Sequence, residues 1–321
     1  MKAMVYRRYG GPEVLEPADL PEPRTHVDSV LVRVRAAALN PADLALQAGA
    51  LDDAVETFFP VVPGWDVAGV VVRSGPAAAE FAPGDEVVGY VRGEVQRAHG
   101  GLAELISADV RTLVHKPRSL DFTEAAGLPL AGLTAYRAVV HALDVRPGES
   151  LLVHGAAGGV GSLAAQIAVA RGARVVGSAA PRDAAYVRSL GAEPVAYGPG
   201  TAERVRALVP AGVDTVLDTV GGGVLAATAG AGRDGTRTAS VADMGHPGVV
   251  PVFCRLDGAD LRAVVELAEA GRLRVRVGAT FALEHAADAQ RALAAGGTGG
   301  KVVVTMAPCP SAASCGCRTG P

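Results

Sequence analysis

The clearest chemical motif in the sequence is the glycine-rich run Gly155-Ala156-Ala157-Gly158-Gly159-Val160-Gly161. An apolar run from Leu151 to His154 precedes it, and apolar residues at helical spacing follow from Val160 to Ile167. A glycine loop between a strand and a helix is the context that binds a dinucleotide pyrophosphate, because the backbone can approach closely and the helix N-terminus offers free N–H groups. A tight turn without a ligand is the alternative. We predict a dinucleotide site that includes Gly155, Ala157, Gly158, Gly159 and Val160.

The residues near Ser178, which end the next predicted strand, indicate which dinucleotide binds. A site for NAD places an acidic side chain about 20 residues past the loop, where it holds the ribose hydroxyls. This strand ends instead in Ser178-Ala179-Ala180-Pro181-Arg182, without an acidic residue. Small side chains leave room for a 2′-phosphate, which Arg182 would bind through charge-assisted hydrogen bonds, although a solvated surface arginine is the alternative. We therefore predict NADPH as the cofactor, with Ser178 and Arg182 in its site.

The composition is that of a globular protein with about two domains. Of its 321 residues, 49% are hydrophobic and 20% are charged, and the net charge is −3. This balance excludes a disordered chain and gives no field that attracts nucleic acid or an anionic membrane. The first residues show no apolar signal region, so we expect a cytoplasmic protein. Three of the four cysteines, Cys309, Cys315 and Cys317, lie near the C-terminal end, which argues against a disulfide scaffold or a four-cysteine zinc site.

Two kinds of element follow one another along the chain. In roughly the first third, hydrophobic residues alternate with arginines from Val30 to Ala36 and turn signals separate short apolar runs, which predicts a small, mostly antiparallel β unit. From Thr123 onward, helices and strands alternate, as in a parallel sheet with crossover helices. The predicted strands of this part are 150–154, 174–177, 213–217, 236–241, 274–277 and 301–305, and the predicted helices are 134–143, 160–171 and one after Asp260.

Several motifs in a fixed order give the chain a family resemblance. They are Asn40-Pro41-Ala42-Asp43, the stretch from Pro63 to Val70, Pro83-Gly84-Asp85-Glu86-Val87, the stretch from Pro129 to Tyr136, the glycine loop, and Gly300-Lys301-Val302-Val303. Over residues 1–306 the chain resembles the zinc-independent quinone oxidoreductases, a zeta-crystallin-like branch of the medium-chain dehydrogenase/reductase superfamily. The resemblance implies an α/β fold with a GroES-like catalytic domain (1–122 and 258–307) and a Rossmann domain (123–257) on a doubly wound parallel sheet. We expect a disordered tail over 308–321.

The resemblance also bears on the chemistry, because the zinc-dependent members carry ligands that are missing here. Those members have a cysteine near the position of Asn40, a His-Glu pair in the next motif, and four cysteines around residues 90–105, and this sequence has none of them. A different metal site formed by Asp43, Asp66 and His99 is the weaker alternative. Without a Lewis acid, conjugate hydride addition to a quinone or an α,β-unsaturated carbonyl is favoured over alcohol oxidation, and we predict no metal.

By the same resemblance, Asn40 faces the nicotinamide and the substrate, where it would hydrogen-bond a carbonyl that gains negative charge. An Asn that only fixes the turn before Pro41 is the alternative. Asp43 would orient Asn40 or relay a proton, although we favour a helix cap, and Trp65 would line the cleft or simply fill the core. The further cofactor positions that the family motifs imply are Thr134, Tyr197, Asp218, Gly221 and Lys301.

No side chain in the expected place would supply a proton. Related quinone and enoyl-thioester reductases carry a tyrosine shortly after the Asn or after the next glycine, where this sequence has Leu44-Ala45-Leu46-Gln47 and Gly49-Ala50-Leu51. We therefore expect protonation from solvent, with Tyr90 and His99 as the nearest candidates to replace the tyrosine. His154 is predicted to be a packed histidine rather than an acid.

Three functions remain open at this point. The leading hypothesis is an NADPH-dependent reductase of small quinones or α,β-unsaturated carbonyls. An enoyl reductase acting on a carrier-bound polyketide or acyl thioester is the second hypothesis, and a non-catalytic NADPH-binding protein is the third. Since family members pair through the edges of their Rossmann sheets, we expect a homodimer with the apolar run from Val249 to Phe253 at that edge.

Overall fold

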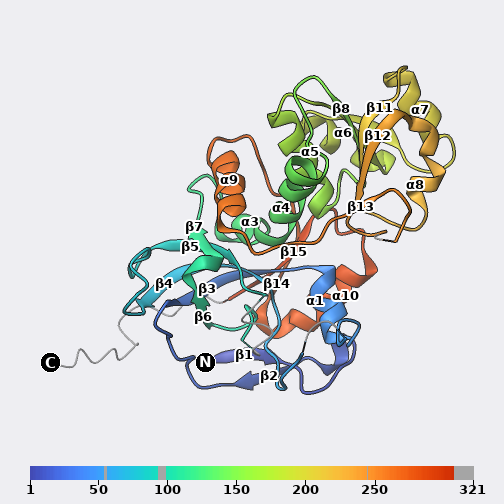
Figure 1. Cartoon of the computed structure of the whole chain (residues 1–321). Helices are drawn as coiled ribbons and strands as arrows, with labels where there is room; N and C mark the ends of the chain where they lie inside the picture. Colours follow the sequence, from blue (N-terminus) through green and yellow to red (C-terminus); the bar gives the residue numbers. More distant parts are fainter. Residues whose placement is uncertain (54–55, 93–98, 244, 307–321) are drawn as a thin grey trace.

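The computed structural model describes residues 1–53, 56–92, 99–243 and 245–306. The predicted tail, with Cys309, Cys315 and Cys317, lies outside the described residues. Figure 1 shows two lobes, an upper one built on a parallel sheet and a lower one built on a mostly antiparallel sheet. One hydrophobic core cluster contains residues of both lobes. Within the described ranges, no helix has the length and apolar character needed to cross a membrane.

The upper lobe contains a six-stranded parallel sheet in the order β10-β9-β8-β11-β12-β13. Its strands are β8 (Ser150–His154), β9 (Arg174–Ala179), β10 (Glu193–Ala196), β11 (Val213–Asp218), β12 (Gly232–Ser240) and β13 (Val250–Pro251). The crossover helices are α5 (Gly159–Ala170), α6 (Ala184–Ser189), α7 (Thr201–Leu208) and α8 (Val224–Ala227). The strand order reverses between β8 and β11, and doubly wound sheets bind ligands at such a switch point. The predicted doubly wound sheet is confirmed.

The lower lobe contains a seven-stranded sheet in the order β14-β15-β3-β4-β5-β7, with β6 also paired to β3. Its strands are β3 (Ser29–Leu39), β4 (Asp66–Ser74), β5 (Glu86–Tyr90), β6 (Leu105–Asp109), β7 (Leu113–His115), β14 (Val277–Ala282) and β15 (Lys301–Thr305). Among the described strand pairs of this sheet, β14 and β15 are parallel and the others are antiparallel. A short antiparallel ladder of β1 (Lys2–Val5) and β2 (Glu16–Asp19) completes the strands described in this lobe.

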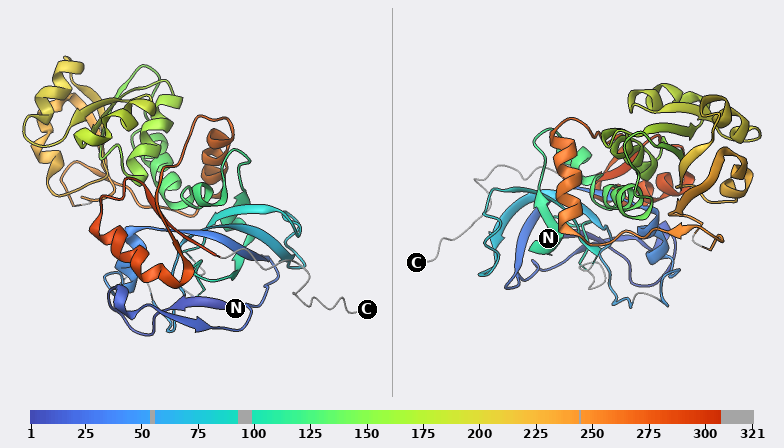
Figure 2. Two further views of the ribbon diagram at one scale, coloured as in Figure 1. Left: turned by 180° about the vertical axis from the view of Figure 1, so that it is seen from behind. Right: turned by 45° about the horizontal axis from the view of Figure 1, so that its top comes forward.

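The chain crosses from the lower lobe to the upper lobe and then returns. Figure 2 shows the C-terminal elements, from β14 to β15, back in the lobe that contains the N-terminus. β15 pairs with β3 in antiparallel register, with Val302 opposite Leu39. The helices associated with this lobe and with the crossing are α1 (Pro41–Gln47), α3 (Phe122–Ala126), α4 (Pro129–Tyr136), α9 (Gly258–Glu269) and α10 (Ala286–Ala295). The last strand therefore depends on pairing with one of the first strands.

Two predicted elements differ from the structure. The helix predicted for 134–143 begins earlier, as α4 at Pro129, and continues as a π-helix over Arg137–Ala142. Proline at the first helical position explains the earlier start, because its fixed φ favours that position. The strand predicted for 274–277 is wrong, because β14 begins only at Val277. The N–H and C=O of Arg274 bond to the side chain of Gln166 on α5 at 2.8 and 3.0 Å, which replaces a strand partner.

Candidate nucleotide and substrate cleft

A cleft of about 1010 Å³ lies where the carboxyl ends of β8, β9 and β11 meet the start of α1 and the residues before β15. A cavity of this size at a switch point is the usual form of a nucleotide site. The predicted site residues that line it are Asn40, Gly155, Ala157, Gly158, Gly159, Val160, Ser178, Arg182, Tyr197, Gly221 and Lys301. Asp43, Trp65, Thr134 and Asp218 are buried and are not among its lining residues.

The glycine loop has the backbone geometry that a pyrophosphate requires. Gly155 has φ +73°, and Gly158 is the N-cap of α5, so that the N–H groups of the first turn are free. A Cβ on Gly161 would lie 2.2 Å from the carbonyl oxygen of Gly155, which explains why the loop can close tightly only with glycine there. The loop therefore fits a dinucleotide, which would place its phosphates against the positive end of α5.

Two alanine substitutions in this loop should separate folding from nucleotide binding. Gly161→Ala is expected to lower the free energy of unfolding by more than about 2 kcal/mol, because its Cβ would clash with backbone. Gly158 has φ −80°, and a Cβ there would lie 3.3 Å from the nearest atom, the carbonyl oxygen of Gly155. Gly158→Ala should therefore change the free energy of unfolding by less than about 1 kcal/mol, while the added methyl group keeps a phosphate from approaching the backbone closely. Urea unfolding and nucleotide titration calorimetry measure the two effects. Equal stability of both variants would contradict the role assigned to Gly161.

Asn40 is held at the floor of the cleft by two charged side chains. Its Nδ2 donates to Asp66 at 2.9 Å, and its Oδ1 accepts from the ammonium of Lys301 at 2.5 Å. Lys301 Nζ also lies 3.6 Å from Asp66 Oδ2, and the other oxygen of Asp66 accepts from Leu130 N–H. One Asn40 N–H and the remaining Lys301 N–H bonds have no partner among the described residues, and Asn40 and Lys301 both line the cleft.

Asp43 fixes the backbone behind this group. Its carboxylate accepts from the Asn40 N–H at 2.7 Å and from the Trp65 N–H at 3.1 Å, which ties the start of α1 to the loop before β4. Burial and, second, the nearby Asp66 raise the pKa of Asp43 to about 7. Burial also raises the pKa of Asp66, although Lys301 opposes this shift. Asp43 thus caps the helix and positions Asn40 without lining the cleft.

The remaining side chains behind the cleft form an apolar layer with a few polar groups. Trp65 packs edge-on against Tyr90 with ring centres 6.1 Å apart. Thr134 donates to the carbonyl oxygen of Leu130 at 2.7 Å. Burial raises the pKa of the Cys254 thiol to about 12, so this cysteine stays protonated. Tyr90 lies in this buried layer and does not line the cleft.

A row of polar side chains crosses the sheet at the carboxyl ends of its strands, and sequence analysis did not find it as a row. Ser178, His154, Asp218 and Ser240 lie in register on β9, β8, β11 and β12. Asp218 accepts from the N–H groups of Val220 and Gly221 and from the Ser240 hydroxyl, so it shapes the turn that lines the cleft. His154 is a packed histidine, as predicted, but both of its ring nitrogens are hydrogen-bonded.

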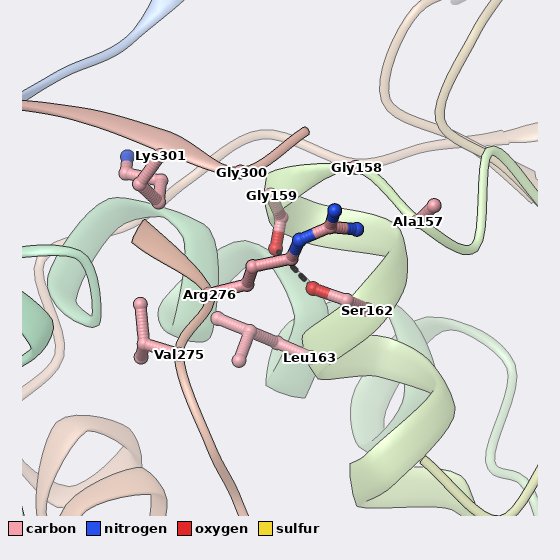
Figure 3. Close-up of a pocket in the computed structure, with 9 residues that line it drawn as sticks. All are labelled: Ala157, Gly158, Gly159, Ser162, Leu163, Val275, Arg276, Gly300 and Lys301. Carbon is pink, nitrogen blue, oxygen red and sulfur yellow. Dashed lines mark hydrogen bonds between the residues drawn. The ribbon is translucent and has the colours of Figure 1, made fainter. Parts of the chain in front are cut away.

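Two arginines lie near the predicted phosphate positions. The Arg182 side chain is 75% exposed on the cleft rim, close to Asp183, and Tyr197 on the same rim is 63% exposed. Arg276 was not predicted by the sequence analysis. It pairs with Asp183 at 3.1 Å, and Figure 3 shows its guanidinium pointing toward Ala157 and Gly158, whereas the Lys301 ammonium points away from them. Arg276 therefore adds positive charge behind the glycine loop.

Across the described ranges, no three histidine, cysteine or acidic side chains lie together as metal ligands. Asp43 and Asp66 are instead engaged by backbone N–H groups, Asn40 and Lys301. The proposed alternative with His99 thus has no such cluster in the structure.

Comparisons with known proteins identify the family to which the chain belongs. Residues 26–118 match the model of the alcohol dehydrogenase GroES-like domain, and residues 190–304 match that of the zinc-binding dehydrogenases. The chloroplastic quinone oxidoreductase QR1 of Triphysaria versicolor is 31% identical over 326 aligned positions, which cover 95% of this chain and 98% of that protein. The chain belongs to the quinone oxidoreductase family of medium-chain dehydrogenases/reductases.

Two further matches to this quinone oxidoreductase family member differ in how much of the chain they cover. The chloroplastic NADPH-dependent alkenal/one oxidoreductase of Arabidopsis thaliana is 41% identical over 228 residues, which are 69% of this chain and 58% of that protein. This match thus spans little more than half of the relative. The crystal structure of an NAD-dependent alcohol dehydrogenase superposes with a TM-score of 0.87 at 34% identity, covering 96% of this chain and all of that chain. The predicted α/β fold with GroES-like and Rossmann parts is confirmed.

Proposed function

We propose that this protein transfers hydride from NADPH to a quinone or an α,β-unsaturated carbonyl, without zinc. The observation that carries the proposal is the hydrogen-bonded pair Asn40 and Lys301, since both residues line the cleft that also contains the glycine loop. The names of relatives support it, because they include an NADPH-dependent alkenal/one oxidoreductase and several quinone oxidoreductases.

The bound cofactor supplies hydride, and the protein supplies position and polarisation. When hydride adds to a conjugated C=C bond, negative charge develops on the carbonyl oxygen. The Lys301 ammonium and the second Nδ2 N–H of Asn40 would stabilise that charge, since both residues line the cleft. Asp66 and Asp43 hold Lys301 and Asn40 in place. No tyrosine other than Tyr197 lines the described cleft, and we propose that solvent supplies the one proton that completes the reduction after hydride transfer.

NADPH rather than NADH is the proposed cofactor. The end of β9 carries small residues and no acid, and Arg182 lies on the rim beside them. The name of the Arabidopsis relative gives the same cofactor. Within this site Thr134 and Asp218 lie behind the cleft lining. Thr134 donates to the carbonyl oxygen of Leu130, and Asp218 holds the turn with Gly221; Leu130 and Gly221 both line the cleft.

NADPH oxidation with three substrates tests the proposed function. 1,4-Benzoquinone or an enone should be reduced at least tenfold faster than a crotonyl thioester. Faster reduction of the thioester would replace the proposal with the enoyl reductase. Absence of turnover with all three, while NADPH still binds, would leave a non-catalytic nucleotide-binding protein.

We further propose the domain division 1–122 with 258–307 and 123–257, a homodimer and a cytoplasmic location. The two sheets support the division, since each is built from one set of these residues. The dimer is supported by the edge strand β13, where Val250 is 45% and the nearby Phe253 61% exposed. Sedimentation equilibrium measures the mass, and cell fractionation measures the location.

A further inference from the structure

His154 joins two hydroxyl groups at the floor of the cleft. Its Nδ1 lies 3.1 Å from the Ser178 hydroxyl, and its Nε2 lies 3.0 Å from the Thr228 hydroxyl. All three residues are buried, and all three line the cleft. The ring therefore links the end of β9 to the residue that follows α8 through two hydrogen bonds.

The direction of these hydrogen bonds follows from a third one. Thr228 lies 2.7 Å from the carbonyl oxygen of Val224, which only accepts, so the single Thr228 proton points to Val224. Thr228 must then accept from an N–H at His154 Nε2. Burial lowers the pKa of His154 to about 4, so near neutral pH the ring carries only one N–H. Nδ1 is therefore an acceptor, and the Ser178 hydroxyl donates to it.

This direction determines what Ser178 offers to a bound cofactor. With its proton committed to His154, Ser178 presents only lone pairs to the cleft. It stands at the end of β9, about 20 residues past the glycine loop, where an acidic residue would accept from the ribose hydroxyls. In this state Ser178 accepts from a 2′-hydroxyl, as an acid would, but it gives no hydrogen bond to a 2′-phosphate dianion.

Reversal of the same chain of hydrogen bonds gives the opposite state. If the ring proton resides on Nδ1, His154 donates to Ser178, and Ser178 is free to donate to a phosphate oxygen. Nε2 then accepts from Thr228, and only the bond from Thr228 to Val224 is lost. Val224 is one of the residues that line the cleft. One proton leaves Nε2 and one arrives at Nδ1, so the net charge of the protein does not change.

We propose that His154 is a tautomeric switch that lets Ser178 read either the 2′-hydroxyl of NADH or the 2′-phosphate of NADPH. The proposal rests on the proposed function only in that the cleft binds a nicotinamide dinucleotide, and it is independent of the substrate. Ser178 and His154 would thus contribute to the choice between NADH and NADPH separately from Arg182 on the rim.

Nitrogen NMR of the protein labelled with ¹⁵N-histidine reads the tautomer directly at pH 7.5. His154 should carry its proton on Nε2 in the free protein and with 5′-AMP, and on Nδ1 when saturated with 2′,5′-ADP. Arg182→Ala should weaken 2′,5′-ADP binding and still show the change at saturation. The same tautomer with both nucleotides bound would overturn the switch.

A variant that shifts the balance between the two His154 tautomers provides a second test. Thr228→Val removes the anchor that holds the resting direction, so the ratio of NADPH to NADH affinity should rise about two- to tenfold, the worth of one hydrogen bond. Thr219→Val is the matched control, because Thr219 also lines the cleft but bonds the backbone carbonyl of His154. Its affinity ratio should not change. In Ser178→Ala, addition of Thr228→Val should no longer shift the ratio.

The outcomes separate the switch from the proposed reaction. An unchanged affinity ratio in Thr228→Val, measured by calorimetry on a folded variant, overturns the switch. Absence of binding of either nucleotide overturns the switch together with the nucleotide site. Absence of turnover with every substrate, while the tautomer still changes, overturns only the proposed reaction.

Discussion

Lys301→Met should lower the free energy of unfolding by about 3–5 kcal/mol, because it removes the cation from a buried ionic group. Lys301 Nζ bonds Asn40 and lies 3.6 Å from the fully buried Asp66. Without Lys301, Asp66 keeps its hydrogen bonds from Asn40 and Leu130 but loses the only positive charge that the structure shows beside it among the described residues. Urea unfolding measures the loss, and a fall in turnover of at least tenfold should accompany it.

Two controls show whether the buried charge is the cause. Lys116 is equally buried and also donates to the carbonyl oxygens of Pro117 and Leu120, but its ionic partner Glu86 is half-exposed. Lys116→Met therefore leaves no buried carboxylate unpaired and should cost less, about 1–2 kcal/mol. Adding Asp66→Asn to Lys301→Met should restore at least about 1 kcal/mol, because the unpaired carboxylate is then absent. If the double variant were as unstable as the sum of the single variants, the ionic interaction would not explain the loss.

Asp43→Asn should become more stable relative to the wild type as the pH rises from about 4 to about 7. The folded protein holds the Asp43 proton up to about pH 7, whereas the unfolded chain releases it near 4, so folded Asp43 binds more protons in this window. Wild-type stability therefore falls with rising pH by up to roughly 4 kcal/mol from this group. Asp66 and Lys301 face Asp43 in both proteins, so the difference between the two proteins reports Asp43 together with its coupling to these two groups.

The wild type alone would conceal this effect, because His154 acts in the opposite direction. The His154 pKa of about 4 lies below its ordinary value of 6.5, so stability falls as the pH drops through this range. Unfolding of both proteins at pH 4.5, 5.5, 6.5 and 7.5 is the measurement. Glu149→Gln is the control, because the lowered pKa of Glu149 places its contribution below that window. A stability difference for Asp43→Asn that does not vary with pH would contradict the prediction.

The sequence predicted those parts of the site whose residues lie close together along the chain. The glycine loop, α5 and the cap at Asn40 each lie within a few residues, so spacing alone determines them. The row from Ser178 to Ser240 was missed as a row because it depends on register between four strands. The strand predicted at Arg274 was wrong for a similar reason, since a side chain from α5 occupies its backbone groups.

The contact between Lys301 and Asn40 joins residues 261 positions apart. Asn40 follows β3, which is made early in synthesis, but Lys301 opens β15, which pairs with β3 only after the whole upper lobe has left the ribosome. Until then β3 lacks its neighbour β15 and Asp66 lacks the ammonium group of Lys301, although all strands of the upper lobe have already been synthesised. The floor of the cleft thus joins an early and a late part of the chain, and a chain cut before β15 would leave Asp66 without Lys301.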